Sequence, residues 1–373
     1  MADSTKSALL PAPILFADAA VEALEASKTL PAKFTRMLAR SDLNKLVSGR
    51  RVVIKMHLGS DIGFTTIHPL FVRILVKAVN EAGAASVAII DGNPPENGIP
   101  RGLTKEVIGC PVKYCFGEDG NDLIPHRIDY LSFDEALFGK TALDADVFIS
   151  LAHVKAHGAC GFGGSLKNIA MGTIPPLTRQ KLHRLEGGHT YDPSSCTFCL
   201  KCYNSCPNGA INIDREKRTI SFFYHHCTYC QHCLMACPEG AITMHDRRFK
   251  DFARGMALVT DAFLNRYAPD RLFFINVLTN ITMYCDCWGF SSPPLVPDVG
   301  ILAGRDIAAI DTASLDLIKT ENLIPGGLPK NRPNLGEGNH LFEKIHGKNP
   351  YLMLEYLEEV YPCTGNYSLE EVA

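Results

Sequence analysis

The chain has 373 residues, of which 46% are hydrophobic and 21% are charged, a composition typical of a folded protein long enough for two domains. Its formal net charge of −3 at pH 7 gives no general attraction to nucleic acid or anionic lipid, so we expect no nucleic-acid partner. No apolar run of about eighteen residues is present, which argues against a membrane span. Pro11, Pro13 and Asp18 interrupt the N-terminal apolar stretch, so we interpret it as mature sequence rather than a signal peptide.

The first half of the chain alternates between predicted strands and helices. Four apolar runs predict strands, at residues 51–56, 86–90, 111–116 and 145–151. Residues 69–84 have apolar side chains at helical spacing, with Pro69 near the first turn and Gly83 as a stop. Because turn-rich polar loops follow the strands, the pattern predicts an α/β fold with a mainly parallel sheet flanked by helices.

A glycine-rich segment, residues 153–175, follows the last of these strands. Its glycines permit a backbone with free amides, at Gly158, Gly161, Gly163 and Gly164. The next residues, Ser-Leu-Lys-Asn, would start a helix, so the segment could bind an anion such as a phosphate, helped by Lys155 and Lys167. An equally good interpretation is a tight chain path, since neither the Walker A nor the Rossmann glycine pattern is present.

Basic and histidine side chains flank this segment. Arg179 belongs to a basic stretch, 177–184, that either adds to an anion site or lies on a solvated face. His153 and His157 lie four residues apart, which on a helix would place them on one face as a metal pair. Glycine follows His157 directly, so we expect a loop there instead.

Eight of the fourteen cysteines occur in two copies of the pattern C-x2-C-x2-C-x3-C-P, between Cys196 and Cys237. Disulfides belong mostly to small domains in oxidising compartments, so metal bound in a reducing cytoplasm explains this spacing better. Three thiolates of one copy can hold a [4Fe–4S] cluster whose fourth ligand comes from the other copy. We therefore predict two clusters, one held by Cys196, Cys199, Cys202 and Cys237 and the other by Cys227, Cys230, Cys233 and Cys206.

This segment resembles the bacterial two-cluster ferredoxins, with 188–246 as an inserted ferredoxin-like (α+β) domain. Zinc is the alternative, but zinc usually takes two separated C-x2-C pairs around one ion. A purely structural role is the alternative for the clusters themselves. Two neighbouring clusters instead favour electron transfer.

The α/β pattern resumes after the cysteine-rich segment. Residues 251–267 predict an amphipathic helix and 271–278 a buried strand, followed by a strand at 298–304 and a helix at 306–324. The tail ends in a predicted helix at 351–361. We therefore divide the chain into four parts: 1–187, the first part of the α/β domain; 188–246, the insert; 247–325, its second part; and 326–373, a C-terminal tail.

A Cys-x-Cys pair, Cys285 and Cys287, forms a second unusual site. In an extended segment both thiols would face one side and Asp286 the other. Such a pair could bind a soft metal or line a redox pocket. The alternative is two buried free cysteines that pack as small hydrophobic residues.

Three stretches of the chain resemble the DUF362 family of iron–sulfur-centre proteins. They are "VVIKMHLG" with "GFTTIHPLFVRILVKAVNEAGAASVAIIDGNP", then "HVKAHGACGFGGSLKNIAMGTIPPLTRQKLHR", and "CDCWGF" with "PLVPDVGILAGRDIAAIDTASLDL". The similarity runs from residue 13 to residue 325. It implies no particular activity, but it implies that several residues belong to recurring motifs and are candidate site residues: Lys55, Thr66, Asp91, Lys155, His157, Lys167, Asn168, Cys285, Cys287 and Asp311.

We therefore expect an iron–sulfur electron-transfer protein, an oxidoreductase or a subunit of one. Its two clusters would relay electrons between a redox partner protein and a site where the loops at Lys55, Asp91 and His157 gather. That site could take a small-molecule substrate and a further metal, flavin or nucleotide. The alternative is a ferredoxin-like carrier or assembly protein without catalysis of its own. A third interpretation is a nucleic-acid enzyme with structural clusters. The slightly negative net charge of the chain argues against it.

Overall fold

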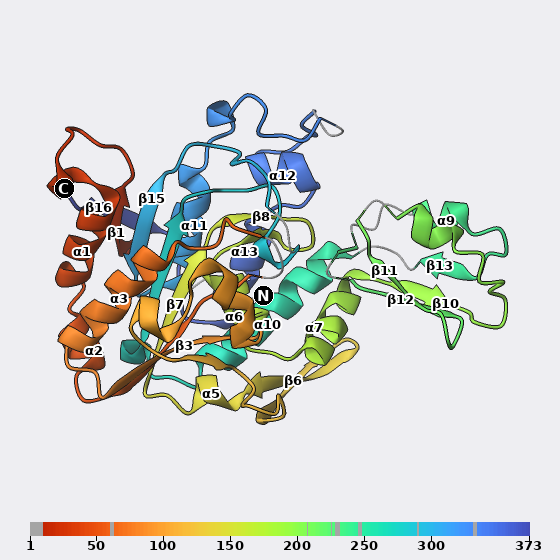
Figure 1. Ribbon diagram of the computed structural model, residues 1–373, viewed down its shortest axis with the longest axis horizontal. Coiled ribbons are helices and arrows are strands. Elements are labelled where there is room, and N and C mark those ends of the chain that lie inside the picture. The colour runs from red at the N-terminus through yellow and green to blue at the C-terminus, as the bar shows by residue number, and fades with distance from the viewer. Residues whose placement is uncertain are drawn as a thin grey trace, which may run out of the picture.

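The computed structural model describes residues 10–59, 63–206, 208–224, 226–227, 232–244, 248–288, 291–330 and 334–373. These residues form a large α/β body and a smaller cysteine-rich lobe that extends from one side of it (Figure 1). No helix in this part of the chain is both long and apolar enough to cross a bilayer.

An eight-stranded sheet forms the centre of the body, with the order β16-β1-β15-β14-β7-β2-β3-β4. Its strands are β1 (Ala12–Asp18), β2 (Arg51–Lys55), β3 (Ser86–Asp91), β4 (Val112–Tyr114), β7 (Val147–His153), β14 (Leu272–Leu278), β15 (Gly300–Gly304) and β16 (Tyr367–Glu371). Only β15 runs antiparallel to its neighbours; the other described pairs are parallel. The predicted mainly parallel sheet is confirmed.

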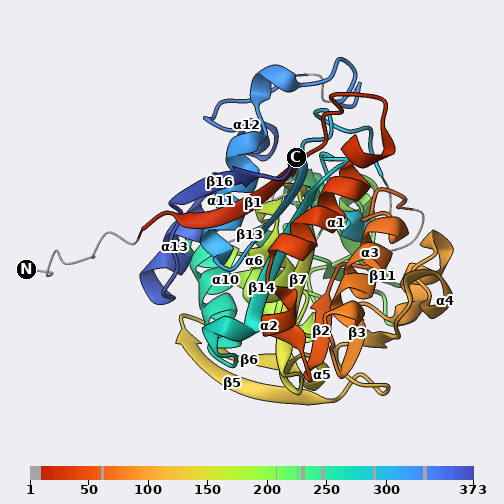
Figure 2. The ribbon, with the colours of Figure 1, turned by 90° about the vertical axis from the view of Figure 1, so that its left-hand side faces the viewer.

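Helices cover both faces of this sheet (Figure 2). One face carries α1 (Leu30–Arg40), α2 (Leu43–Val47), α3 (Pro69–Glu81) and α4 (Lys105–Ile108). The other carries α6 (Ser165–Ala170), α10 (Phe249–Leu264), α11 (Ile307–Leu317) and α13 (Leu352–Val360). Strand β2 has a continuously apolar sequence because both of its faces are buried. Val53 packs into one core, and Val52 and Ile54 pack into the other.

Smaller elements complete the body. They are the antiparallel ribbon of β5 (Leu123–Tyr130) and β6 (Phe133–Gly139), and the helices α5 (Lys140–Leu143), α7 (Pro176–His183) and α12 (Leu341–His346). The glycine-rich segment forms a hairpin of β8 (Lys155–His157) and β9 (Gly161–Gly163), so the expectation of a loop at His157 is wrong. Helix α6 begins at Ser165, where the sequence predicted a helix.

The cysteine-rich lobe repeats one strand–helix–strand unit. The first copy is β10 (His189–Tyr191), α8 (Lys201–Asn204) and β11 (Ile211–Asp214); the second is β12 (Thr219–Phe222), α9 (His232–Ala236) and β13 (Ile242–Met244). Strand β10 pairs with β13 and β11 pairs with β12, both antiparallel. The first strand of the first copy therefore pairs with the last strand of the second copy, and the two strands between them pair with each other. The duplication in the sequence is thus also present in the structure.

Candidate functional site

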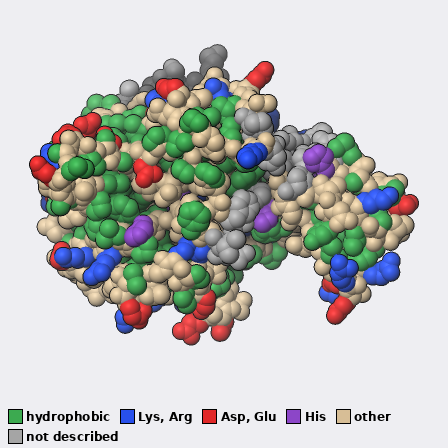
Figure 3. Space-filling view, turned by 45° about the horizontal axis from the view of Figure 1, so that its top comes forward, with side chains coloured by type: hydrophobic (Ala, Val, Ile, Leu, Met, Phe, Trp, Pro, Cys, Tyr) green, Lys and Arg blue, Asp and Glu red, His purple; other side chains and the backbone are tan. Residues whose placement is uncertain are grey.

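A cavity of about 650 Å³ lies at the carboxyl ends of three parallel strands. Lys55, Asp91 and His153, the last residues of β2, β3 and β7, all line it. Helices α6 and α7 contribute further lining residues, and the β11–β12 hairpin of the lobe supplies Phe222 on the opposite side. The cavity therefore lies between the body and the lobe, which Figure 3 shows standing beside each other with a notch between them. Crevices at the carboxyl ends of parallel strands are where α/β proteins bind ligands.

A buried ion pair occupies the floor of this cavity. Lys55 Nζ lies 2.9 Å from Asp91 Oδ1, and neither side chain is more than 2% exposed. Burial alone would raise the pKa of Asp91, but the Lys55 ammonium and the neighbouring His57 ring outweigh burial and hold this pKa below its usual value. The carboxylate also accepts hydrogen bonds from the amides of Leu58 (2.9 Å) and Gly92 (2.7 Å), so it is fixed in place as an anion.

Asn168 connects this ion pair to helix α6. Its side-chain oxygen accepts from Lys55 Nζ at 2.9 Å, and its amide nitrogen donates to the Lys55 carbonyl at 2.8 Å. The same nitrogen donates to Ser150 Oγ, which lies 3.1 Å from Ser165 Oγ at the start of the helix. The position of the Lys55 ammonium therefore depends on where α6 begins.

Asp311 fixes that beginning. Its carboxylate accepts from the amides of Ser165 and Leu166, each at 2.8 Å, and from Asn276 Nδ2 at 2.7 Å. Burial raises the pKa of Asp311 to about 6. A side chain at position 164 would place its Cβ 2.6 Å from Asp311 Oδ1, so Gly164 permits this approach. The first two amides of helix α6, which the sequence offered to an external anion, are therefore already bonded to Asp311.

The Cys-x-Cys segment forms a short 3-10 turn, η5 (Asp286–Trp288), not the extended strand that we expected. Asp286, which we expected on the side opposite the two thiols of an extended segment, is 1% exposed and bonded within the body. One of its oxygens lies 3.0 Å from Lys155 Nζ and 2.8 Å from His153 Nδ1. The other accepts from Thr65 Oγ1 at 3.1 Å. These three contacts explain the correction, because they draw the carboxylate inward and bend the chain.

The two sulfurs on either side of Asp286 are electrostatically unequal. Lys167 Nζ donates to Cys285 Sγ at 3.2 Å. Burial opposes ionisation of Cys285, but the hydrogen bond from the Cys287 thiol and the Lys167 charge outweigh it, so the pKa of Cys285 lies well below that of an ordinary thiol. Burial and the same hydrogen bond raise the pKa of Cys287 well above its usual value. Ionisation of the pair therefore favours the Cys285 sulfur, which lies against Lys167.

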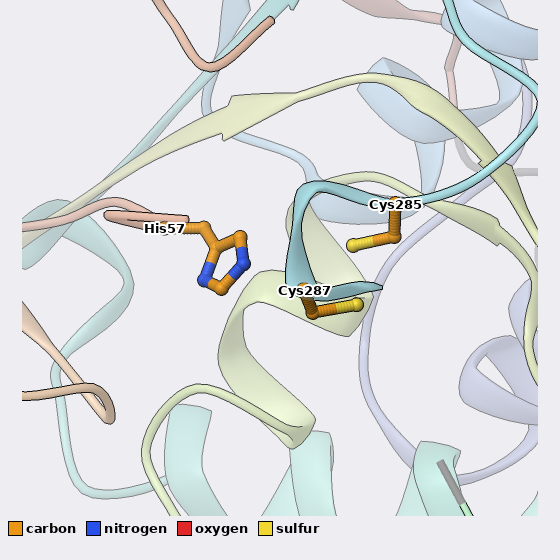
Figure 4. A group of neighbouring side chains, drawn as sticks. All are labelled: His57, Cys285 and Cys287. Atoms are coloured by element: carbon orange, nitrogen blue, oxygen red, sulfur yellow. The ribbon is translucent and has the colours of Figure 1, made fainter. Parts of the chain in front are cut away.

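His57 is a site residue that the sequence analysis missed. It follows β2 by two residues, lines the cavity and has its ring Nδ1 3.3 Å from Asp91 Oδ2. Its ring faces the two cysteines (Figure 4), and one ring nitrogen and the two sulfurs all lie within 4.8 Å of one another. The signal available in the sequence was a polar residue just beyond a predicted strand.

The remaining candidates divide between the cavity and other places. The predicted residues that line it are Lys55, Asp91, Lys155, Gly163, Gly164, Lys167, Asn168, Arg179 and Cys287. Gly158, Gly161 and Thr66 are not among the described residues that line it. His157 and Cys285 are fully buried behind the lining. The Arg179 guanidinium donates to the carbonyls of Gly92 and Ile174, both at 2.9 Å, which holds it at the cavity.

A second, smaller cavity lies inside the lobe. It is lined by four cysteines, Cys196, Cys199, Cys202 and Cys237, with hydrophobic neighbours that include Phe198 and Ile242. Burial raises the pKa of the Cys202 thiol, and the other three sulfurs add to this effect. Three of these cysteines come from the first C-x2-C-x2-C array and the fourth from the end of the second.

The structure describes three of the four cysteines predicted to hold the second cluster. Cys227 and Cys233 are buried in the core of the lobe and Cys206 packs against it, while Cys230 lies outside the described residues. Cys233 Sγ lies 3.6 Å from His189 Nε2, and the His189 ring stacks on Phe222 with centroids 4.2 Å apart. Phe222 lines the large cavity, so contacts connect this set of thiols to the cavity.

Comparison with known proteins gives one family and several remote structures, among them the following two. A family model described as a domain of unknown function, DUF362, matches residues 52–316. A protein from Thermotoga maritima has a TM-score of 0.37 at 12% identity, covering 68% of this chain and 52% of its own. The lactate racemase apoprotein from Thermoanaerobacterium thermosaccharolyticum has a TM-score of 0.36 at 12% identity, covering 72% and 51%. The chain spans about half the length of each structure. No curated protein matches it.

Proposed function

Because the chain belongs to the DUF362 family, whose model carries no activity, we propose a function from its own residues. The protein is an iron–sulfur oxidoreductase or a subunit of one. The lobe holds two [4Fe–4S] clusters, and electrons pass between a partner protein and a small anionic substrate in the cavity between lobe and body.

The observation that carries this proposal is the gathering of Cys196, Cys199, Cys202 and Cys237 around one small cavity. Three thiols of one array and the last thiol of the other form the ligand set that two-cluster ferredoxins use. Backbone amides also face the sulfurs: Phe198 donates to Cys196 Sγ at 3.4 Å and Ala210 to Cys206 Sγ at 3.2 Å. Such hydrogen bonds tune the reduction potential of a bound cluster, which accepts and releases single electrons.

The shared cavity favours an enzyme over a simple electron carrier. A carrier needs no enclosed space at the junction of its parts, whereas this cavity is lined by both lobe and body. Four basic side chains, Lys55, Lys155, Lys167 and Arg179, line it with one carboxylate, Asp91. A cationic cavity of this kind suits an anionic small molecule such as a carboxylate or a phosphate.

Metal and sulfide analysis tests the iron–sulfur part of the proposal. Protein purified and reconstituted without oxygen should hold about eight irons and about eight acid-labile sulfides per chain. It should give a low-potential paramagnetic resonance signal on reduction. Cys199→Ala should remove about half of the iron, whereas Cys110→Ala, a buried cysteine of the body, should remove none. Stoichiometric zinc without sulfide in the wild-type protein would contradict the proposal.

Ligand binding distinguishes the enzyme from the carrier. Phosphate and small carboxylates should raise the melting temperature of the wild-type protein, because a ligand that binds only the folded state stabilises it. Lys167→Met should abolish this rise, whereas Lys330→Met, at an exposed lysine, should keep it. A rise of equal size in both variants would place anion binding outside the cavity and favour the carrier.

A further inference from the structure

Beyond the cysteine-rich lobe, the body contains a second group of metal-ligand side chains. They are His57, in the segment after β2, Cys285, just before the η5 turn, and Cys287, within that turn. One ring nitrogen and the two sulfurs lie within 4.8 Å of one another (Figure 4). We propose that these three residues bind one divalent transition-metal ion of the zinc class at the wall of the cavity, separate from the clusters of the lobe.

The histidine has the surroundings of a metal ligand. Its Nδ1 is hydrogen-bonded to Asp91 Oδ2 at 3.3 Å, so the ring proton lies on that nitrogen. Its Nε2 is buried and has no hydrogen-bond partner among the residues that the structure describes. Metal-bound histidines typically donate their other ring N–H to a carboxylate, as His57 does here. A metal would use the lone pair of Nε2, which otherwise remains buried at a cost in free energy.

Each sulfur also has a hydrogen-bond donor beside it. Lys167 Nζ donates to Cys285 Sγ at 3.2 Å, and His157 Nε2 lies 3.7 Å from Cys287 Sγ. The His157 Nδ1 accepts from the amides of Ala159 and Cys160, so the ring proton lies on Nε2 and faces the sulfur. Donors of this kind orient thiolate ligands and balance their charge.

The turn between the two cysteines is fixed before any metal binds. Asp286 is held by Lys155, His153 and Thr65, which come from β8, β7 and the segment before α3. The two thiols therefore approach each other because the residue between them is anchored in the body. A loop with this much support can present ligands without a large loss of conformational entropy.

The ligand types select the class of metal. Two sulfurs and one imidazole suit zinc and its soft neighbours, whereas calcium and magnesium prefer oxygen ligands. Three protein ligands are the number found in catalytic zinc sites, in which water or substrate takes the fourth position. His57 and Cys287 line the cavity, so this position is accessible from it. The metal site stands on the geometry alone; its use by a substrate rests on the proposed function.

The test uses the full chain, reconstituted with iron and sulfide, incubated with Zn²⁺ and freed of excess metal. The wild-type protein should retain about one zinc per chain, and its X-ray absorption should show two sulfurs at about 2.3 Å and nitrogen at about 2.0 Å. His57→Ala, Cys285→Ser and Cys287→Ser should each lose this zinc and keep their iron, which also serves as the folding check. His126→Ala and Cys110→Ala, in the β5–β6 ribbon and in the opposite core, are matched controls that should keep both metals.

The outcomes separate this inference from the proposed function. Zinc that disappears in the three variants of a protein without iron or sulfide would support the metal site and contradict electron transfer through clusters. Equal zinc in the wild-type protein and all three variants would overturn the metal site, as would an absorption spectrum without sulfur neighbours. In the expected case, Cys199→Ala loses iron and keeps zinc, whereas Cys285→Ser does the reverse.

Discussion

Lys155 Nζ lies 3.0 Å from Asp286 Oδ2, and both side chains are almost wholly buried. The lysine belongs to β8 and the aspartate to the Cys-x-Cys turn, so this ion pair attaches the turn to the body. His153 Nδ1 and Thr65 Oγ1 also contact the Asp286 carboxylate, which anchors it to further segments of the body. The same contact that stabilises the fold therefore also determines where the two thiols lie.

Asp286→Asn should lower the free energy of unfolding by about 3 kcal/mol, because it leaves the buried Lys155 charge uncompensated. The variant should also bind zinc more weakly than the wild-type protein, since its turn is less firmly held. Thermal unfolding and zinc titration measure the two effects. Asp270→Asn breaks an exposed pair with Arg271 and should change stability by no more than about 0.5 kcal/mol. Equal effects of the two substitutions would contradict the role given to Asp286.

The fold was predictable from sequence where burial on both faces makes strands continuously apolar. Strands β2, β3, β7 and β14 were found this way, whereas helices α3 and α10 were found from apolar residues at helical spacing. The helix predicted at 306–324 was too long: α11 ends at Leu317, and Ile318 has an extended backbone.

Strand β1 was not predicted; its sequence includes Pro13, which cannot donate a backbone hydrogen bond. Pairing with β15 begins only at Leu15, so the missing N–H of Pro13 is tolerated. Its other neighbour, β16, lies more than 300 residues away in sequence, beyond any local pattern.

The site was predictable only where a side chain belongs to a recognised motif. Lys55 and Asp91 met that condition and do pair in the cavity. His57 did not stand out, because its nearness to Cys285 depends on contacts between segments more than 200 residues apart. The inward position of Asp286 likewise depends on Lys155, which no spacing rule connects to it.

Paired substitutions test whether the cysteine arrays exchange their last ligands. With exchange, Cys199→Ala and Cys237→Ala damage the same cluster, so the double variant should keep about four irons. Cys199→Ala combined with Cys206→Ala damages both clusters and should leave almost none. If each array held its own cluster, the two double variants would give the opposite iron contents. Iron and sulfide assays on anaerobic protein decide between these patterns.

A third buried ion pair attaches the C-terminal segment near the start of the lobe. Lys348 Nζ lies 2.8 Å from Glu186 Oε2, and both side chains are at most 1% exposed. Lys348→Met should lower the free energy of unfolding by about 3 to 5 kcal/mol, because the Glu186 carboxylate loses its counter-charge. Combining it with Glu186→Gln should cost less than the sum of the two single changes. Lys330→Met, at an exposed position, is the control in the same urea titrations, and strict additivity would contradict the coupling.

His183 should make the protein less stable in mild acid. Its ring is buried, stacks on Phe252 with centroids 5.0 Å apart, and has its pKa lowered well below the usual value by burial and by the nearby His157 and Lys348. The unfolded chain takes up a proton at this residue near pH 6.5, whereas the folded chain stays neutral. As the pH falls below about 6.5, the unfolded state therefore binds more protons and stability is lost, by up to about 1.4 kcal/mol per pH unit.

His183→Phe keeps an aromatic ring against Phe252 and removes the titrating group. Between about pH 6.5 and about pH 5, its unfolding free energy should therefore fall less steeply than that of the wild-type protein. The difference in slope should be at most about 1.4 kcal/mol per pH unit, the contribution of one proton. Urea titrations across this range measure the slope for each protein. His126→Phe, in the β5–β6 ribbon, controls for the general effect of exchanging a histidine for an aromatic residue. If His183→Phe and the wild-type protein lose stability at the same rate, the acid sensitivity comes from other groups, and His183 is not held neutral by the fold.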